Sequence, residues 1–120
     1  MVRRLLLPTV VAAAVFGVVA AGQAATKTTK LSGVDGPGYT ITVKSGGKTV
    51  KTLKAGTYTL VVADKSNQHN FHLFGPGVSK STSVPFTGTK TWKVTLKKGA
   101  YTYQCDIHAV DGMKGTLKVT

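Results

Sequence analysis

Three side chains near the C-terminus have the types and the spacing of metal ligands. Cys105, His108 and Met113 offer a thiolate, an imidazole and a thioether within nine positions, in a Cys-x2-His-x4-Met pattern. Thiolate and thioether sulfurs are soft ligands that select copper, and imidazole also binds copper well. Two histidines and a cysteine with a weak axial methionine form a blue-copper electron-transfer site. The pattern therefore predicts one type 1 copper ion per chain, with a second histidine supplied from elsewhere.

The second histidine must come from residues 67–73, because His69 and His72 are the other two histidines of the sequence. On a strand, residues three apart point to opposite faces. His69 shares its parity with Phe71 and Leu73, which are expected to face the core, so His69 is the predicted ligand. His72 is then expected on the other face, exposed or hydrogen-bonded to a neighbour. A β-bulge between the two would exchange their roles.

Each of these residues has an ordinary structural explanation when taken alone. A single cysteine in a strand is usually a small buried hydrophobe, and a single methionine usually fills space in a core. Cys105 is the only cysteine of the chain. A lone cysteine in a secreted protein indicates intermolecular pairing or a thiol with a function, and metal ligation is one such function. The combination of ligand types at this spacing favours copper over the separate explanations.

The rest of the chain predicts an all-β scaffold. Apolar residues alternate with polar ones, many of them threonine or lysine, which is the signature of half-buried strands. The alternating runs are 39–43, 58–62, 92–96, 101–105 and 117–119. Glycine-rich turns separate them, as in antiparallel sandwiches and barrels. Residues 75–88 lack strong alternation, and we expect a long connection across one end of the sandwich.

The ligand pattern resembles that of the type 1 copper proteins, the cupredoxin family of plastocyanin, amicyanin and small bacterial relatives. The resemblance covers residues 38–120 and rests on the His69-Asn70 pair, on Gly-x-Tyr leading to Cys105, and on the ligand loop ending at Gly115. The loop length is similar to that of plastocyanin, whereas the His-Asn-x-His run is similar to that of amicyanin. The resemblance implies a Greek-key β-sandwich of about seven to eight strands, with His69 as a ligand and Asn70 bracing the ligand loop.

The same resemblance implies how electrons would enter and leave. In the family they pass through the exposed edge of the C-terminal ligand histidine, which corresponds to His108. An apolar docking rim is expected around it, formed by Phe74, Pro76, Ala109 and Val110.

Two positions depart from the family pattern. Ile107 stands where many relatives have proline, and Asp106 stands where serine or threonine is common after the cysteine. Neither departure removes a ligand. Asp106 is expected to contact the ligand loop, and both residues could alter loop stiffness or the hydrogen bonds to sulfur, and so the reduction potential.

The N-terminus has the marks of a secretory signal peptide. Arg3 and Arg4 precede an apolar run at 10–21, and small residues follow at 22–25. We therefore predict a signal peptide at 1–25, a loose segment at 26–37 and the folded domain at 38–120. The expected location is outside the cytoplasm, in the periplasm or at the cell surface. An uncleaved N-terminal anchor is the alternative.

The chain is strongly basic. Its formal net charge is +12, and without the two leader arginines the remainder is +10, with fourteen lysines and four aspartates. Such a charge favours an anionic partner, either a redox protein with an acidic docking surface or a membrane surface. The absence of arginine after residue 4 argues against nucleic-acid binding. A solvated, soluble lysine surface is the plainer alternative. The protein is expected to be a monomer.

These features together predict a secreted protein that carries single electrons by cycling copper between Cu(I) and Cu(II). An enzyme is not expected, because the sequence offers no second copper cluster, no nucleophile with a base and no phosphate loop. One alternative is a copper-binding or copper-delivery protein without a dedicated redox partner. Another is a metal-free structural or adhesion sandwich.

Overall fold

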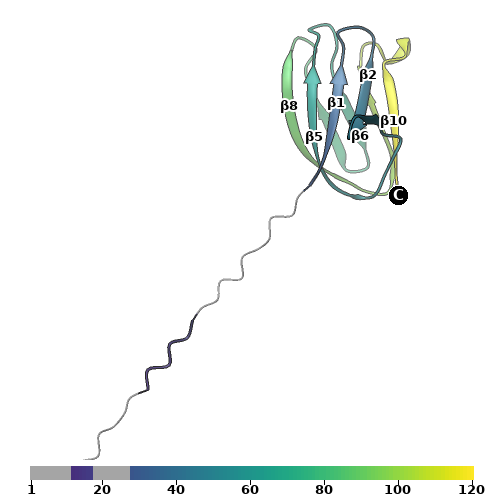
Figure 1. Ribbon diagram of the computed structural model, residues 1–120. Coiled ribbons are helices and arrows are strands. Elements are labelled where there is room, and N and C mark those ends of the chain that lie inside the picture. Colours follow the sequence, from purple (N-terminus) through teal and green to yellow (C-terminus); the bar gives the residue numbers. More distant parts are fainter. Residues whose placement is uncertain (1–11, 18–27) are drawn as a thin grey trace, which may run out of the picture.

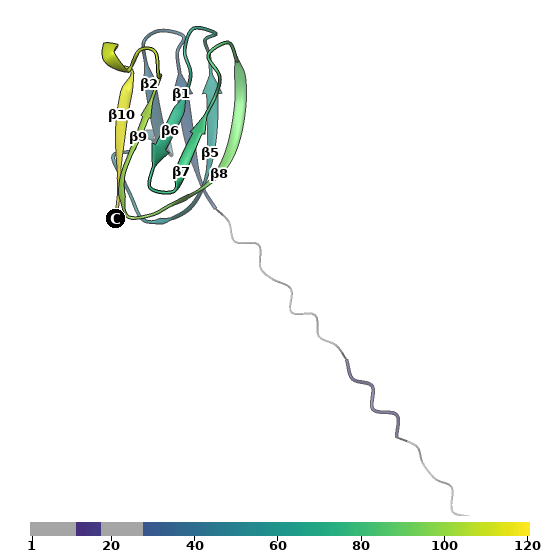
Figure 2. The same ribbon diagram turned by 180° about the vertical axis from the view of Figure 1, so that it is seen from behind.

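The computed structural model describes residues 12–17 and 28–120. In these residues, ten strands form two five-stranded sheets, and one short 3-10 helix lies outside the sheets (Figures 1 and 2). Residues 12–17 contain neither helix nor strand, and the rest of the predicted signal peptide at 1–25 lies outside the described residues. Within the described parts of the chain, no apolar helix reaches membrane-spanning length.

The first sheet has the strand order β3-β2-β1-β5-β8. Its strands are β1 (Thr29–Asp35), β2 (Ile41–Ser45), β3 (Lys48–Thr49), β5 (Gly56–Asp64) and β8 (Gly88–Leu96). β1 runs parallel to β5, and the other neighbours are antiparallel. Because β1 and β5 are parallel, the C-terminal residues of both strands lie at the same end of the sandwich.

The second sheet has the strand order β4-β10-β9-β6-β7. Its strands are β4 (Thr52–Leu53), β6 (His72–Gly75), β7 (Val78–Ser81), β9 (Gly99–Gln104) and β10 (Lys114–Val119). The 3-10 helix η1 (Ala109–Asp111) lies in the loop between β9 and β10. This loop contains three of the four predicted ligands.

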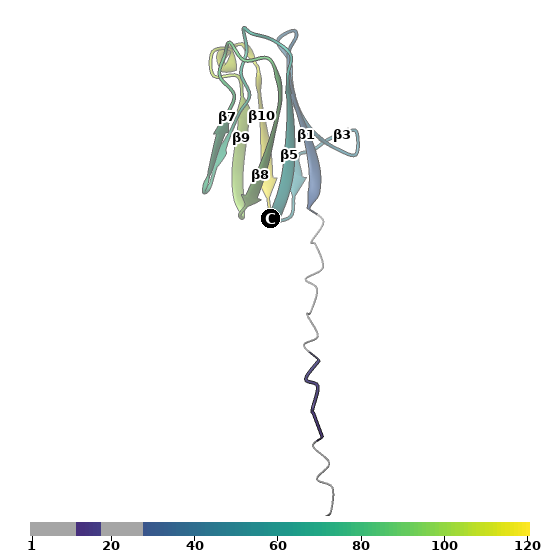
Figure 3. The same cartoon turned by 90° about the vertical axis from the view of Figure 1, so that its left-hand side faces the viewer.

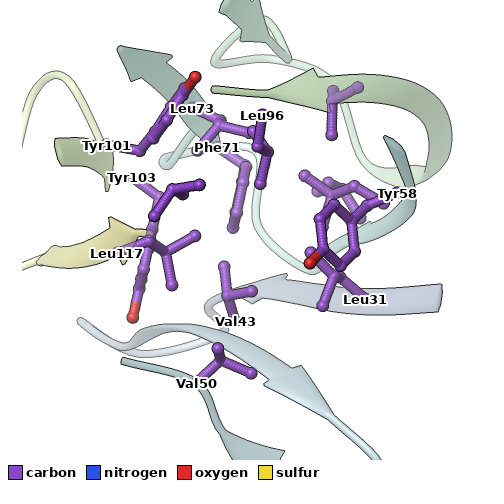
Figure 4. Packing of buried hydrophobic residues seen from close by; sticks show 14 residues of the cluster. Leu31, Val43, Val50, Tyr58, Phe71, Leu73, Leu96, Tyr101, Tyr103 and Leu117 are labelled. Carbon is purple, nitrogen blue, oxygen red and sulfur yellow. The ribbon is translucent and has the colours of Figure 1, made fainter. Parts of the chain in front are cut away.

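The two sheets pack face to face, as the edge-on view in Figure 3 shows. Alternate residues of each strand point between them, so the core forms from inward-facing apolar side chains (Figure 4). Phe71 and Tyr103 stack with parallel rings whose centroids are 6.1 Å apart. Leu31 and Val43 pack from the opposite sheet. The core thus holds β6 and β9, and with them the ends of the ligand loops, in fixed register.

The all-β sandwich is confirmed, and the five alternating runs all overlap strands. The prediction of a loose segment at 26–37 is wrong for residues 29–35, which form β1 between β2 and β5. The inward positions of β1 are Leu31, Gly33 and Asp35, so a glycine and an acid interrupt its apolar pattern. The connection expected at 75–88 also contains an element, the polar edge strand β7.

Candidate metal centre

Three potential donor side chains gather at one end of the sandwich. His69, Cys105 and His108 are the one group of three or more histidine, cysteine or acidic residues in the described chain that could share a metal ion. The two Nδ1 atoms are 2.9 Å apart. Cys105 Sγ lies 3.8 Å from His69 Nδ1 and 3.5 Å from His108 Nδ1. His69 and Cys105 are buried, whereas His108 is partly exposed.

The size of this triangle fits a first-row metal ion. A triangle with sides of 2.9, 3.5 and 3.8 Å has a point in its plane about 2.0 Å from all three corners. In zinc sites, metal–nitrogen bonds to histidine are about 2.0–2.1 Å long and metal–thiolate bonds about 2.3 Å. Zinc and copper ions are similar in size, so these lengths serve as a guide. An ion can therefore enter after an outward shift of the sulfur by a few tenths of an ångström. The donor set of one thiolate and two imidazoles suits copper.

The loop that carries Cys105 and His108 is held closed by its own backbone. Cys105 N–H donates to the Met113 carbonyl at 3.0 Å, and His108 N–H donates to the Cys105 carbonyl at 3.2 Å. Gly112 ends η1 with φ 92°, in the left-handed region that glycine adopts without strain. These bonds constrain the loop around Ile107 without a proline.

Met113 lies next to the cluster through its backbone. Its N–H donates to the His108 carbonyl at 3.1 Å, and its side chain is fully buried. Its role as an axial sulfur ligand stays a prediction from the spacing.

His69 comes from the loop between β5 and β6, not from a strand. β6 begins only at His72, so His69 and Asn70 precede it. Asn70 exchanges two hydrogen bonds with Asp106, one from its Nδ2 to Asp106 Oδ2 at 2.9 Å and one from Asp106 N–H to its Oδ1 at 2.8 Å. This reciprocal pair joins the His69 loop to the Cys105 loop across the sheet.

Asp106 is the centre of a wider hydrogen-bond network. It also accepts from Gln104 Nε2 at 3.1 Å and contacts His72 Nδ1 at 2.9 Å. Partial burial raises the pKa of Asp106, but hydrogen bonds from Asn70, Gln104 and His72 outweigh this effect and lower the pKa below its ordinary value. The other ring nitrogen of His72 lies 3.0 Å from Ser79 Oγ. His72 therefore contacts the back of the ligand loop and does not point toward the donor triangle.

Buried polar groups anchor the His69 loop from the opposite side. Thr82 Oγ1 accepts from Phe71 N–H at 2.9 Å and donates to Asp64 Oδ2 at 2.8 Å. Asp64 and Asp35 are register partners at the ends of β5 and β1. Asp35 is fully buried, and its two carboxylate oxygens have no hydrogen-bond donor among the described residues. A proton shared with Asp64 would supply their one hydrogen bond.

Tyr39 is a site residue that sequence reasoning missed. Its ring meets the His69 and His108 rings edge-on, with centroids 5.3 and 4.8 Å away. The alternation had placed it in a strand, but β2 begins at Ile41 and Tyr39 lies in the preceding loop, 63% exposed. An aromatic residue directly after Gly-Pro-Gly was the available signal.

The structure separates the four residues of the predicted docking rim. Ala109 and Val110 lie in η1 beside His108, and Val110 is 92% exposed. Pro76, however, lies at the other end of the sandwich, where its carbonyl accepts from Tyr101 Oη and its ring is near Gly99. Phe74 pairs with Thr102 part-way down β9. The β6–β7 hairpin runs away from the metal end, which separates both residues from His108.

The exposed apolar residues near His108 are instead Tyr39, Ile107 and Val110. Ile107 is 53% exposed and adjoins His108 in the ligand loop. Tyr39 packs against the ring of the partly exposed His108, and Ile107, Ala109 and Val110 lie next to this histidine in the chain.

Two face-to-face sheets with a histidine–cysteine–histidine cluster at one end define the cupredoxin fold, and this chain has it. Solved structures with this fold include the copper protein rusticyanin, which is 20% identical at a TM-score of 0.59 and covers 80% of both chains. Rusticyanin from Thiobacillus ferrooxidans in another structure is 23% identical at a TM-score of 0.52, over 80% of this chain and 79% of that chain. Auracyanin from the photosynthetic bacterium Roseiflexus castenholzii is 19% identical at a TM-score of 0.55, over 79% of this chain and 99% of that chain. No protein-family model and no curated protein matches the chain.

Proposed function

We propose that this protein is a blue copper protein that carries single electrons outside the cytoplasm. The observation that carries the proposal is the donor triangle of His69, Cys105 and His108, whose size and chemistry fit a copper ion. The neighbouring fold of rusticyanin, a copper protein, supports it. A bound copper ion would supply the Cu(I)/Cu(II) couple, and Met113 is proposed as its weak axial ligand.

The residues of the chain would make electron transfer possible by keeping the donors in place. The Asn70–Asp106 pair and the backbone bonds of the Cys105–Met113 loop fix the donors from both sides. A preorganised donor set changes little when the charge of the ion changes, so the cost of rearrangement in each transfer is small. Burial of His69 and Cys105 excludes water from that side.

The proposed route for electrons is the partly exposed ring of His108. Tyr39 packs against this ring, and the neighbouring loop residues Ile107, Ala109 and Val110 would extend it into an apolar surface for a redox partner. We further propose that the partner carries acidic groups, because the chain has a net charge of +12 and its overall field would steer an acidic partner toward it. The rate of transfer should then fall as salt is raised.

The proposed location rests on the leader-like sequence at 1–25 together with the lone cysteine. A free thiol at Cys105 is protected from oxidation when a metal occupies it, which suits an oxidising compartment.

Copper delivery is the second candidate, because the same donor set could pass Cu(I) to another protein. Voltammetry of the copper-loaded protein separates the two functions. A carrier shows a reversible one-electron couple and keeps its copper in both states when a Cu(I) chelator is added. Loss of copper to the chelator on each reduction would favour delivery. The variant His72→Ala keeps all three residues of the donor triangle, so it should behave like the unmodified protein in this assay and serves as the control.

A further inference from the structure

The lysines of this protein are unevenly distributed, and one end of the sandwich is strongly basic. This is the end opposite the donor triangle, where β8 and β10 finish and β5 and β9 begin (Figure 1). Five exposed lysines lie in or next to its connections: Lys51, Lys54, Lys97, Lys98 and Lys118. We call this set the lysine end.

Backbone contacts bring these connections together. Lys118 N–H donates to the Lys51 carbonyl at 2.9 Å, and Ala55 N–H donates to the Thr120 carbonyl at 2.9 Å. Lys97 and Lys98 form the turn between β8 and β9, with Lys97 N–H on Tyr101 Oη. Gly99 also pairs with Val119, so the connections that carry the five lysines adjoin one another at this end of the sandwich.

No acidic side chain of the described residues offsets this charge. Asp35 and Asp64 end β1 and β5 at the metal end, and Asp106 and Asp111 lie in the ligand loop. These four are all the acidic residues that the sequence contains. All charged side chains at the lysine end are therefore positive.

A groove of about 820 Å³ opens between three of the lysines. Lys51, Lys98 and Lys118 line it together with a mostly apolar floor that includes Val50 and Val119. An apolar groove bordered by ammonium groups fits an anionic amphiphile, whose phosphate pairs with the lysines while its apolar part covers the floor.

The chain also enters the fold at this end. β1 starts at Thr29, which pairs with Tyr58, and Tyr58 in turn bonds to the Lys54 carbonyl. The apolar run at 10–21 precedes β1 in the sequence. A chain held at a membrane by that run would have the lysine end nearest to the bilayer.

We propose that the lysine end binds the surface of an anionic phospholipid membrane and leaves the metal end pointing away from it. Lysines near such a surface each contribute about fivefold in binding, equivalent to about 1 kcal/mol. The metal centre would then remain accessible to a partner while the protein stays at the membrane. This surface is distinct from the apolar surface around His108 and can be tested on metal-free protein.

The test uses residues 26–120, because all ten strands and the buried core lie within 29–119. Binding is measured by co-sedimentation with vesicles of phosphatidylcholine alone or with phosphatidylglycerol. The triple variant Lys51→Gln, Lys98→Gln, Lys118→Gln should lose about a hundredfold in affinity for the anionic vesicles. Binding by the unmodified protein should weaken as salt is raised.

A matched control removes the same charge elsewhere. Lys65, Lys80 and Lys90 are exposed toward the metal end, where Lys65 follows the last residue of β5, Lys90 pairs with Val62 of β5 and Lys80 pairs with Leu73 of β6. Their triple replacement by glutamine should cost less than about tenfold, because these positions lie away from the bound surface.

Equal losses in the two triple variants would overturn the proposal, since binding would then follow net charge alone. Equal binding of the unmodified protein to both kinds of vesicle would also overturn it. Tighter binding to heparin, a soluble polyanion, than to anionic vesicles of equal charge would reassign the surface to a polysaccharide and reject the membrane.

Discussion

Replacing Asp35 by asparagine should stabilise the folded protein at neutral and alkaline pH. Burial raises the pKa of Asp35 from 3.8 to about 7, and a hydrogen bond to Asp64 and repulsion from its charge act in the same direction. Asp35 therefore keeps its proton in the folded protein at pH 6 and donates it toward Asp64. An asparagine amide can donate to Asp64 in its place without ever becoming charged.

The magnitude follows from linkage between proton binding and folding. Below about pH 4 both the folded and the unfolded chain hold the proton on Asp35, so this residue gives no pH dependence. Between about pH 4 and pH 7 only the folded chain holds it, and the free energy of unfolding falls as pH rises. About three pKa units at about 1.4 kcal/mol each give a loss on the order of 4 kcal/mol across this window.

Urea unfolding of metal-free protein between pH 4 and pH 8 measures this effect. The stability of Asp35→Asn minus that of the unmodified protein should be near zero at pH 4 and should rise to several kcal/mol at pH 8. Every other titratable group is present in both proteins, so its contribution cancels in the difference. Asp111→Asn, at an exposed acid in η1, is the control and should show no such trend. A difference for Asp35→Asn that stays constant with pH would refute the assignment of a shared proton to this pair.

Three further predictions concern the metal centre and its support. His69→Ala should abolish the blue colour of the copper protein or replace it with another copper species, whereas His72→Ala should stay blue; the reverse result in visible spectra would exchange the two roles. Met113→Leu should stay blue, bind copper with little loss of affinity and raise the reduction potential, because a weak donor to Cu(II) is lost; an unchanged potential in voltammetry would show that Met113 is not axial. Gly115→Ala should destabilise the fold by about 1–3 kcal/mol in urea unfolding, since the new methyl group would enter the Tyr103 ring; unchanged stability would contradict the packing.

The metal cluster was largely predictable because most of its information is local in sequence. Cys105, His108 and Met113 lie in one loop, and the chain offers only two candidates for the remaining histidine. The parity argument favoured His69, although the structure places it in a loop before β6. The burial of Phe71 and Leu73, on which that argument depended, is confirmed.

The supporting contacts were not predictable because they join distant segments. The Asp35–Asp64 pair requires the parallel register of β1 and β5. β1 itself was missed because glycine, and not an apolar side chain, occupies the inward position 33. The Phe71 ring fills the space there: a Cβ atom on Gly33 would lie 2.8 Å from Phe71 Cζ.

The separation of the predicted docking residues was not predictable for the same reason, because it depends on which distant segments meet. Phe74 and Pro76 are close to His69 in sequence, but β6 carries them away from the metal end. Tyr39 is far from the ligands in sequence, yet its loop folds over both histidines. Strand direction, which the alternation pattern does not reveal, decides which loops meet.

The visible absorption spectrum of residues 26–120 titrated with Cu(II) tests the central claim most directly. The proposed site predicts one copper ion per chain and an intense blue charge-transfer band from the Cys105 thiolate, which Cys105→Ser should abolish. Copper binding without colour, or a Cys105→Ser variant that remains blue, would contradict the assignment of a type 1 copper centre.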